Sequence, residues 1–220
     1  MRRSFELFRP YRGVPVLPWT AKSRWDLSLN RLFILLIALS IFGLGEALLI
    51  KSGLGNAPWS VLGQGIAEQL QISIGWATLL VSTLVLLMWI PLKERPGFGT
   101  ILNIVVIAAS IDIGLAIFPE QNHLVYELTY VLIGIALVGV GSAFYITCGL
   151  GPGPRDGWMT AIHNRTGVRI GRVRLAIELT VLTLGWLLGG SLGVGTALFA
   201  LFIGHSVAIS FGVISRITNR

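Results

Sequence analysis

The stretch GLGNAPWS at residues 53–60 returns 96 residues later as GLGPGPRD at residues 149–156, which keeps both glycines, the leucine and the proline. Sliding the chain along itself by this offset pairs residues 36–113 with residues 132–209 without a gap. The alignment gives 24 identities in 78 positions, and seven of these identities are glycines. Because apolar composition alone does not align glycines at one fixed offset, the chain consists of two copies of one unit.

The composition places both copies in a membrane. Of the 220 residues, 54% are hydrophobic and only 12% are charged, with a mean hydropathy of +0.78. A soluble domain carries about 25% charged residues, so the ordinary soluble classes are excluded. Apolar runs of roughly 20 residues can cross a bilayer as helices and therefore predict an all-α integral membrane protein. Six transmembrane helices are expected, near residues 32–50, 74–92, 100–118, 128–147, 173–189 and 195–214.

The positions of the basic residues predict the orientation. With the amino terminus inside and six alternating helices, 16 of the 17 Lys and Arg residues are cytoplasmic and only Lys51 lies outside. The net charge of +7 is therefore expected to face anionic headgroups of the inner leaflet, with no nucleic-acid partner. The predicted organisation is a basic cytoplasmic tail (1–31), a first three-helix repeat (32–118), an outer loop (119–127), a second three-helix repeat (128–214) and a cytoplasmic carboxyl terminus (215–220).

Each unit contains three expected crossings and one short connector, residues 58–71 in the first and 154–167 in the second. An odd number of crossings turns the second copy upside down, so the sequence predicts two inverted-topology repeats, which are typical of secondary transporters. Each connector is expected to begin a helix after its proline, with Ser60 or Asp156 as the N-cap. Two placements stay open: re-entrant helices that meet inside the membrane, or interfacial helices that lie on opposite faces.

The connectors also carry a family resemblance. Residues 58–60, and especially GPGPRDGWM at residues 151–159, resemble the paired signatures of the YczE/YyaS/YitT-like bacterial integral membrane proteins. The resemblance covers about residues 32–214, and this chain has Ser60 where an Asp is common in the first signature. What the resemblance implies is a multi-pass protein of the bacterial plasma (inner) membrane, without a particular substrate or reaction.

Charged residues inside the expected helices are costly and are therefore candidate functional residues. Glu46 and Asp112 lie at similar depth near the outer ends of their helices and could bind a coupling proton or cation. Alternatively, Glu46 forms an ion pair with Lys51, and Asp112 reaches the outer headgroups. Glu178 is expected to pair with Arg174 one helical turn away. Close helix packing, rather than ligand binding, is expected of the matched glycines Gly43, Gly45, Gly139 and Gly141.

The second connector supplies most of the candidate substrate-binding residues. Arg155 has the planar fork that binds carboxylates and phosphates, and the nearby backbone amides could face an anion at a helix amino terminus. Alternatively, Asp156 caps the helix and Arg155 pairs with a lipid phosphate. His205, near the middle of the last helix, could relay protons or form a hydrogen bond with the substrate. The predicted substrate-binding set is Arg155, Asp156, Gly151, Gly153, Gly157, Ser60 and His205.

These patterns predict a secondary transporter or exporter of a small anionic or zwitterionic solute, in which one repeat rocks against the other. The alternative is a membrane scaffold that assists a partner complex through its tail or the basic face of residues 155–174. A more remote alternative is an intramembrane serine protease with Ser142 and His205. The sequence has no phosphate-binding loop and no HExxH motif, so we expect no enzymatic activity, cofactor or metal. The expected partners are the lipid bilayer, the solute and a second copy in a homodimer.

Overall fold

The computed structural model describes residues 10 and 13–218. The beginning of the predicted tail, residues 1–9 and 11–12, and residues 219–220 of the predicted carboxyl terminus lie outside the described part. Within it, the regular secondary structure is entirely α-helical, as the sequence predicts. The helices are α2 (Leu29–Lys51), α3 (Pro58–Leu70), α4 (Ile74–Leu87), α5 (Trp89–Leu92), α6 (Phe98–Ile117), α7 (Leu124–Thr147), α8 (Pro154–Thr166), α9 (Ile170–Leu187) and α10 (Val194–Thr218).

Among the described residues, five helical segments are long and apolar enough to cross a membrane. They are α2, α4 together with α5, α6, α7 and α10, which match five of the six predicted spans. The predicted span at residues 173–189 corresponds to α9, whose 18 residues include Arg172, Arg174 and Glu178. These charged residues make α9 less apolar than the other five helical segments, and charges are costly in hydrocarbon.

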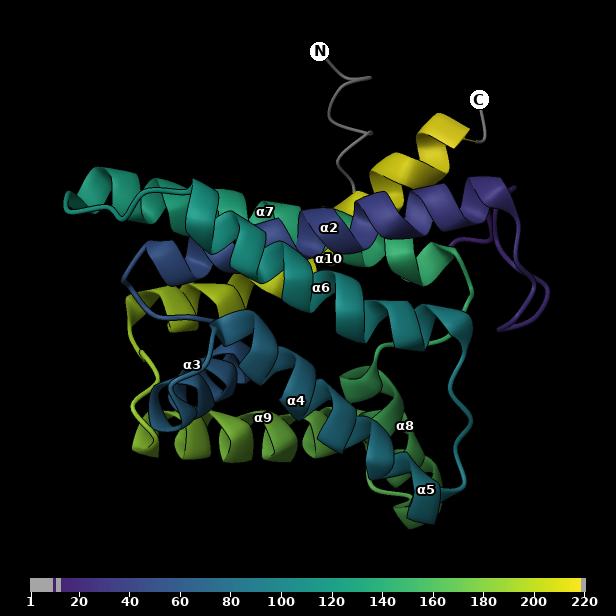
Figure 1. Ribbon diagram of the computed structural model, residues 1–220. Coiled ribbons are helices and arrows are strands. Elements are labelled where there is room, and N and C mark those ends of the chain that lie inside the picture. The colour runs from purple at the N-terminus through teal and green to yellow at the C-terminus, as the bar shows by residue number, and fades with distance from the viewer. Residues whose placement is uncertain (1–9, 11–12, 219–220) are drawn as a thin grey trace.

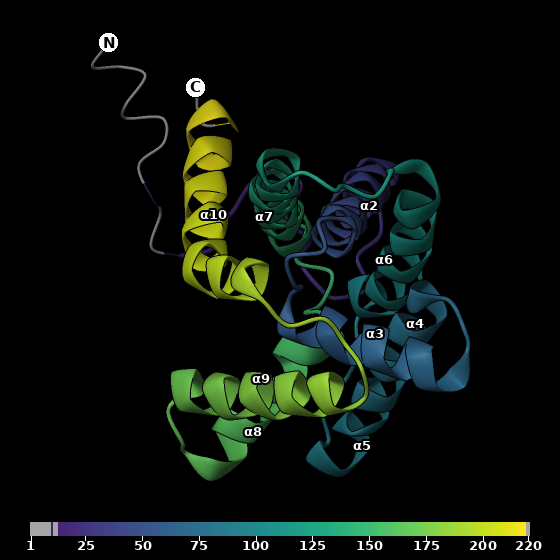
Figure 2. The same ribbon diagram turned by 90° about the vertical axis from the view of Figure 1, so that its left-hand side faces the viewer.

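The helices form two layers (Figures 1 and 2). One layer contains α2, α6, α7 and α10, and the other contains α3, α4, α5, α8 and α9. In the first layer α2 packs against α6 and α7, and α10 packs against α7. In the second layer α3 packs against α4 and α9, and α8 contacts α4, α5 and α9. Each layer therefore combines helices from both sequence repeats.

Glycines allow α2 and α7 to approach closely. A Cβ atom on Gly45 would lie 2.9 Å from the carbonyl oxygen of Gly134, and one on Gly141 would lie 2.6 Å from that of Ala38. The two contacts are equivalent, because each residue of the first contact is matched with a residue of the second at the 96-residue offset. Residue numbers rise along α7 as they fall along α2, so the first helices of the two units are antiparallel. The predicted packing role of Gly45 and Gly141 is confirmed.

The loop before each connector docks on the other unit. The N–H of Gly195, at the start of α10, donates to the carbonyl of Leu54 at 2.7 Å. The matched N–H of Gly99, at the start of α6, donates to the carbonyl of Leu150 at 2.8 Å. Since these bonds join the units in both directions, each unit fixes the position of the other unit's connector.

Residues 13–28, which we call the N-terminal strap, pack over the end of the bundle where α7 ends and α6 begins. Trp19 Nε1 donates to Thr147 Oγ1 at 3.2 Å, and the N–H of Phe98 donates to the carbonyl of Arg24 at 3.0 Å. Leu17 is buried in a cluster with Ala143, Phe211 and Ile214. The last part of the predicted tail is therefore folded against the helices.

Cys148 follows α7 directly and is fully buried beside the strap. Burial raises the pKa of its thiol to about 11. Because the thiolate is the reactive form, we expect a maleimide at pH 7.5 to leave the folded protein unlabelled and to label the denatured protein fully. Mass spectrometry of the intact chain measures both, and rapid labelling of the folded chain would contradict this burial.

Candidate functional site

The two connectors are the short helices α3 and α8, which begin at Pro58 and Pro154. Proline suits the first helical position, because its φ is preset and its missing N–H would have had no partner there. The residue before each proline provides no side-chain cap. The prediction that Ser60 or Asp156 is the N-cap is therefore wrong, since the proline starts the helix two residues earlier and both side chains lie in the first turn.

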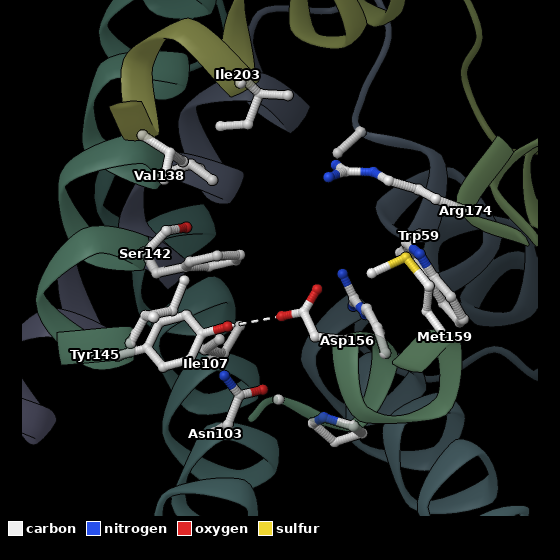
Figure 3. Close-up of a pocket in the computed structure, with 18 of the residues that line it drawn as sticks. Trp59, Asn103, Ile107, Val138, Ser142, Tyr145, Asp156, Met159, Arg174 and Ile203 are labelled. Carbon is white, nitrogen blue, oxygen red and sulfur yellow. Dashed lines mark hydrogen bonds between the residues drawn. The ribbon is translucent and has the colours of Figure 1, made fainter. Parts of the chain in front are cut away.

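A cavity of about 510 Å³ lies between the two layers, where the amino-terminal turns of α3 and α8 meet. Both first turns line it, together with residues of α2, α4, α6, α7, α9 and α10 and the beginning of the N-terminal strap. Figure 3 shows Ser142 and Tyr145 of α7 across the open space from Trp59, Asp156 and Met159. The two connectors thus share one cavity instead of lying on opposite faces of the molecule.

Residues matched by the repeat line this cavity in pairs. The pairs include Glu46 with Ser142, Pro58 with Pro154, Trp59 with Arg155, Asn103 with Phe199, and Ile107 with Ile203. Several pairs differ in chemistry: a carboxylate matches a hydroxyl, an indole matches a guanidinium, and an amide matches a phenyl ring. The cavity is therefore nearly symmetric in the positions of its residues and asymmetric in their chemistry.

One side-chain hydrogen bond ties each connector to the first helix of its own unit. Ser60 Oγ of α3 donates to Glu46 Oε2 of α2. Tyr145 OH of α7 donates to Asp156 Oδ2 of α8 at 2.8 Å (Figure 3). Glu46 and Tyr145 are only 2% and 5% exposed, so both bonds form away from bulk solvent. They hold two carboxylates at the cavity wall, and both belong to the predicted site.

Arg155 provides the positive charge beside these carboxylates. Its guanidinium carbon lies 5.0 Å from the centroid of the Trp59 ring, a cation–π contact between two residues that the repeat matches. The carboxylates of Glu46 and Asp156 act on it electrostatically. Within the part of the chain that the structure describes, however, Arg155 forms no ion pair or side-chain hydrogen bond. Since a guanidinium has five N–H donors, Arg155 can bind a carboxylate or phosphate of a ligand.

Two ion pairs decide between the predicted alternatives for the other charged residues. Arg174 and Glu178, at the edge of the cavity, form the expected pair at 2.8 Å, which is confirmed. Lys51 pairs with Glu120 at 3.2 Å. The predicted ion pair between Glu46 and Lys51 is therefore wrong, because Glu46 points from α2 toward α3 while Lys51 reaches the loop after α6.

Asp112 lies apart from the cavity. Its carboxylate accepts hydrogen bonds from Ser73 Oγ at 2.5 Å and from the N–H of Gly75 at 2.7 Å. These bonds fasten the start of α4 to α6, so Asp112 holds a contact between two helices. The structure does not bring Asp112 and Glu46 together, and the role of Asp112 in ion coupling stays a prediction.

Ser142 and His205 lie at two different places. Ser142 lines the cavity, whereas His205 is exposed in a largely apolar groove between α7 and α10. His205 Nδ1 lies 3.4 Å from the carbonyl oxygen of Leu201 on its own helix. The structure therefore does not bring His205 to Ser142, and it does not place His205 among the cavity residues.

The three predicted site glycines have different surroundings. Gly153 lines the cavity, but Gly151 and Gly157 do not. Gly151 has a φ of +114°, and a Cβ atom there would lie 2.8 Å from Thr100 Oγ1. A Cβ atom on Gly157 would collide with the ring of Trp89. Gly151 and Gly157 are thus required for close packing beside the site.

Three cavity residues, Trp59, Asn103 and Tyr145, were not selected from the sequence. The repeat offset contained the signal for Trp59, because it is the match of Arg155. Tyr145 is an uncharged residue in an apolar helix, matched with a leucine, and nothing in the pattern distinguishes it. In the described residues, no group of His, Cys, Asp and Glu side chains is arranged to hold a metal ion.

Five apolar spans arranged around a cavity that contains charged side chains define a multi-pass helical membrane protein. The chain belongs to DUF6198, a family of unknown function whose model matches residues 29–211. This agrees with the resemblance carried by the two connectors, which is confirmed by relatives from Bacillus subtilis.

Three relatives show how far the similarity extends. A Haemophilus influenzae protein named "Uncharacterized protein" is 47% identical over 208 residues, which cover 94% of this chain and 95% of that protein. The B. subtilis "Uncharacterized membrane protein YczE" is 31% identical over 182 residues and 82% of each chain. "Uncharacterized protein YyaS" of B. subtilis is 25% identical over 184 residues, 82% of this chain and 92% of that protein. No solved structure matches the chain.

Proposed function

We propose that this protein is a secondary transporter of a small anionic or zwitterionic solute, and that the cavity between α3 and α8 is its binding site. The observation that carries the proposal is Arg155, a guanidinium that lies in the cavity without an ion pair among the described residues. The backbone N–H groups in the first turns of α3 and α8 add positive potential there. Glu46 and Asp156 can accept an ammonium group of a zwitterion or a coupling proton.

The proposed transporter has inverted-topology repeats in the bacterial inner membrane, with both termini in the cytoplasm. The antiparallel packing of α2 against α7 and the reciprocal docking of the two loops support the inversion. The excess of Lys and Arg on one side supports the orientation. In this arrangement α9 is the sixth crossing, with its charged residues at the cytoplasmic end, and α3 and α8 are re-entrant helices.

A difference between the repeats supports a rocking cycle. In the first unit α4 is seated on α6, because Gly75 touches Ala108 and Asp112 so closely that a Cβ atom would collide. In the second unit the matched Gly171 of α9 and Gly204 of α10 have no neighbour within 4 Å of a Cβ atom. One end of the molecule is thus closed and the matched end is open. Exchanging these arrangements would open the cavity to the other side of the membrane.

Matched cysteine pairs test this cycle in a Cys148→Ser background. Ser73→Cys with Asp112→Cys joins two side chains that are in contact here, so we expect oxidation to cross-link them at once. Arg169→Cys with Ala208→Cys is the equivalent pair in the open half, and we expect it to cross-link only while solute is transported. Either cross-link should stop flux by more than tenfold. If Arg169→Cys and Ala208→Cys never cross-link during transport, the rocking cycle is contradicted.

Counterflow in proteoliposomes tests the function itself. Vesicles that contain the full chain are loaded with a panel of organic carboxylates, phosphates, sulfonates and amino acids, and the exchange of each labelled solute is measured. We expect exchange for at least one anionic or zwitterionic member and none in empty vesicles. A complete absence of flux, together with a stoichiometric co-purifying partner, would instead favour the scaffold that the sequence leaves open. Formation of a homodimer stays a prediction.

A further inference from the structure

The two ends of the cavity differ in composition. Figure 3 shows Asn103, Tyr145 and Asp156 at one end, and Val138 and Ile203 at the other, opposite Arg174. The apolar end continues along α10, where the buried side chains of Phe199, Ile203 and Phe211 line the cavity. A ligand that fills the whole space therefore needs a charged head and an apolar body. A pocket of this volume holds a drug-sized molecule.

The apolar end is also the end that opens. Ile177 of α9 and Gly204 of α10 both line the cavity, yet α9 and α10 make no extensive contact with each other (Figure 2). Gly204 is exposed and lies about midway along the 25-residue α10. At 1.5 Å per residue, this depth is near the centre of a bilayer for a spanning helix. The gap between α9 and α10 therefore faces hydrocarbon at this level.

The charges near the gap are already partnered. Arg174 is exposed at the cavity edge, but it is held in the ion pair with Glu178 on the same helix. Arg155, by contrast, has no such partner among the described residues. An anionic head that passes the gap can therefore bind Arg155 at the polar end of the cavity. Its apolar body then lies beside α10.

We propose that the substrate is an amphiphilic organic anion with a single apolar chain or ring body, which enters from the bilayer between α9 and α10. Its head binds Arg155 at the first turn of α8, and its body lies against Phe199, Ile203 and Phe211. This inference rests on the proposed transport function and specifies the class of solute.

Three probes separate the head from the body. The full chain is placed in phosphatidylcholine nanodiscs, and binding is measured by equilibrium dialysis with empty nanodiscs subtracted. Decanesulfonate has an anionic head and a chain, methanesulfonate has the head alone, and decyltrimethylammonium has the chain with the opposite charge. We expect saturable binding of one decanesulfonate per protein, at least about tenfold tighter than methanesulfonate because its methylene groups are buried. We expect no saturable binding of decyltrimethylammonium.

Two variants and one control locate the binding. Arg155→Gln should weaken both sulfonates. Gly204→Leu places a side chain in open space at the gap, so it should weaken decanesulfonate about tenfold and leave methanesulfonate unchanged. Gly171→Leu also meets open space but does not line the cavity, and it should change neither affinity.

The outcomes distinguish this inference from the proposed function. Equal, Arg155-dependent affinity for both sulfonates would overturn the amphiphile and leave the anion transporter standing. Unchanged decanesulfonate affinity in Gly204→Leu would overturn the placement of the apolar body beside α10, and an unchanged rate of binding would overturn entry through the gap. Displacement of decanesulfonate by phosphatidylglycerol in the nanodisc would assign the site to a membrane lipid instead. A lack of saturable binding for every probe would overturn both the inference and the site.

Discussion

Replacing Arg155 with glutamine is expected to weaken binding of the transported anion by about 10- to 100-fold and to abolish flux at low solute concentration. The reason is that a hydrogen bond to a charged group contributes about 1.5–3 kcal/mol, and each 1.4 kcal/mol is tenfold in affinity. No ion pair of the described residues is broken by the change, so the fold should survive it. Counterflow and direct binding measure the two effects.

Two further variants separate a binding role from a general effect of charge. Arg155→Lys keeps the positive charge and loses the planar fork, so we expect partial activity between those of the wild type and Arg155→Gln. Arg165→Gln removes an exposed arginine from the same helix and should have no effect. If Arg155→Gln folds normally and transports at the wild-type rate, the proposed site is wrong.

The second large effect is expected at Gly55. Its φ is +101°, and a Cβ atom would collide with the backbone of Gly193 in the other unit. Backbone strain costs about 1–3 kcal/mol and overpacking about 1–3 kcal/mol more, so Gly55→Ala should lower the free energy of unfolding by about 2–6 kcal/mol. The position of the Cβ atom is fixed by the backbone of residue 55, and it collides with the backbone of Gly193, so no rotamer change can relieve the collision.

Gly53 is the matched control. Its φ is +71°, but a Cβ atom there has no neighbour within 4 Å. Gly53→Ala should therefore cost only the strain of a left-handed residue, about 1 kcal/mol. Denaturation of both variants in the same detergent compares them directly. Equal stabilities would contradict the close docking of the loop of residues 53–57 on the start of α10.

The sequence predicts the charged residues of the site, because charged residues are rare in an apolar membrane protein. The cost of placing charge in a membrane predicts Glu46, and the guanidinium fork at the start of the second connector predicts Arg155; the structure puts both at one cavity. Asp112 satisfies the same cost rule as Glu46 but lies elsewhere, where its carboxylate accepts backbone and hydroxyl hydrogen bonds between two helices. Composition cannot separate these two uses of a carboxylate.

Other features of the site depend on which helices face one another in the folded protein. His205 was selected for its depth, and depth does not tell whether a side chain points into a bundle or away from it. Tyr145 was not selected, since its importance comes only from the hydrogen bond to Asp156. The N-cap prediction is wrong because Pro58 and Pro154 are the first residues of their helices, and the local sequence is compatible with either start.

The helical membrane class and the use of one unit twice follow from the amino-acid chain, because hydrophobic length and a fixed repeat offset are properties of the chain alone. The chain also marks the two connectors as unusual segments. The shared cavity, the contact of Arg155 with Trp59, and the packing of α4 on α6 while α9 stands apart from α10 follow from the three-dimensional fold. These features arise from packing between distant segments, where backbone contacts at glycines, rather than local preference, select the arrangement.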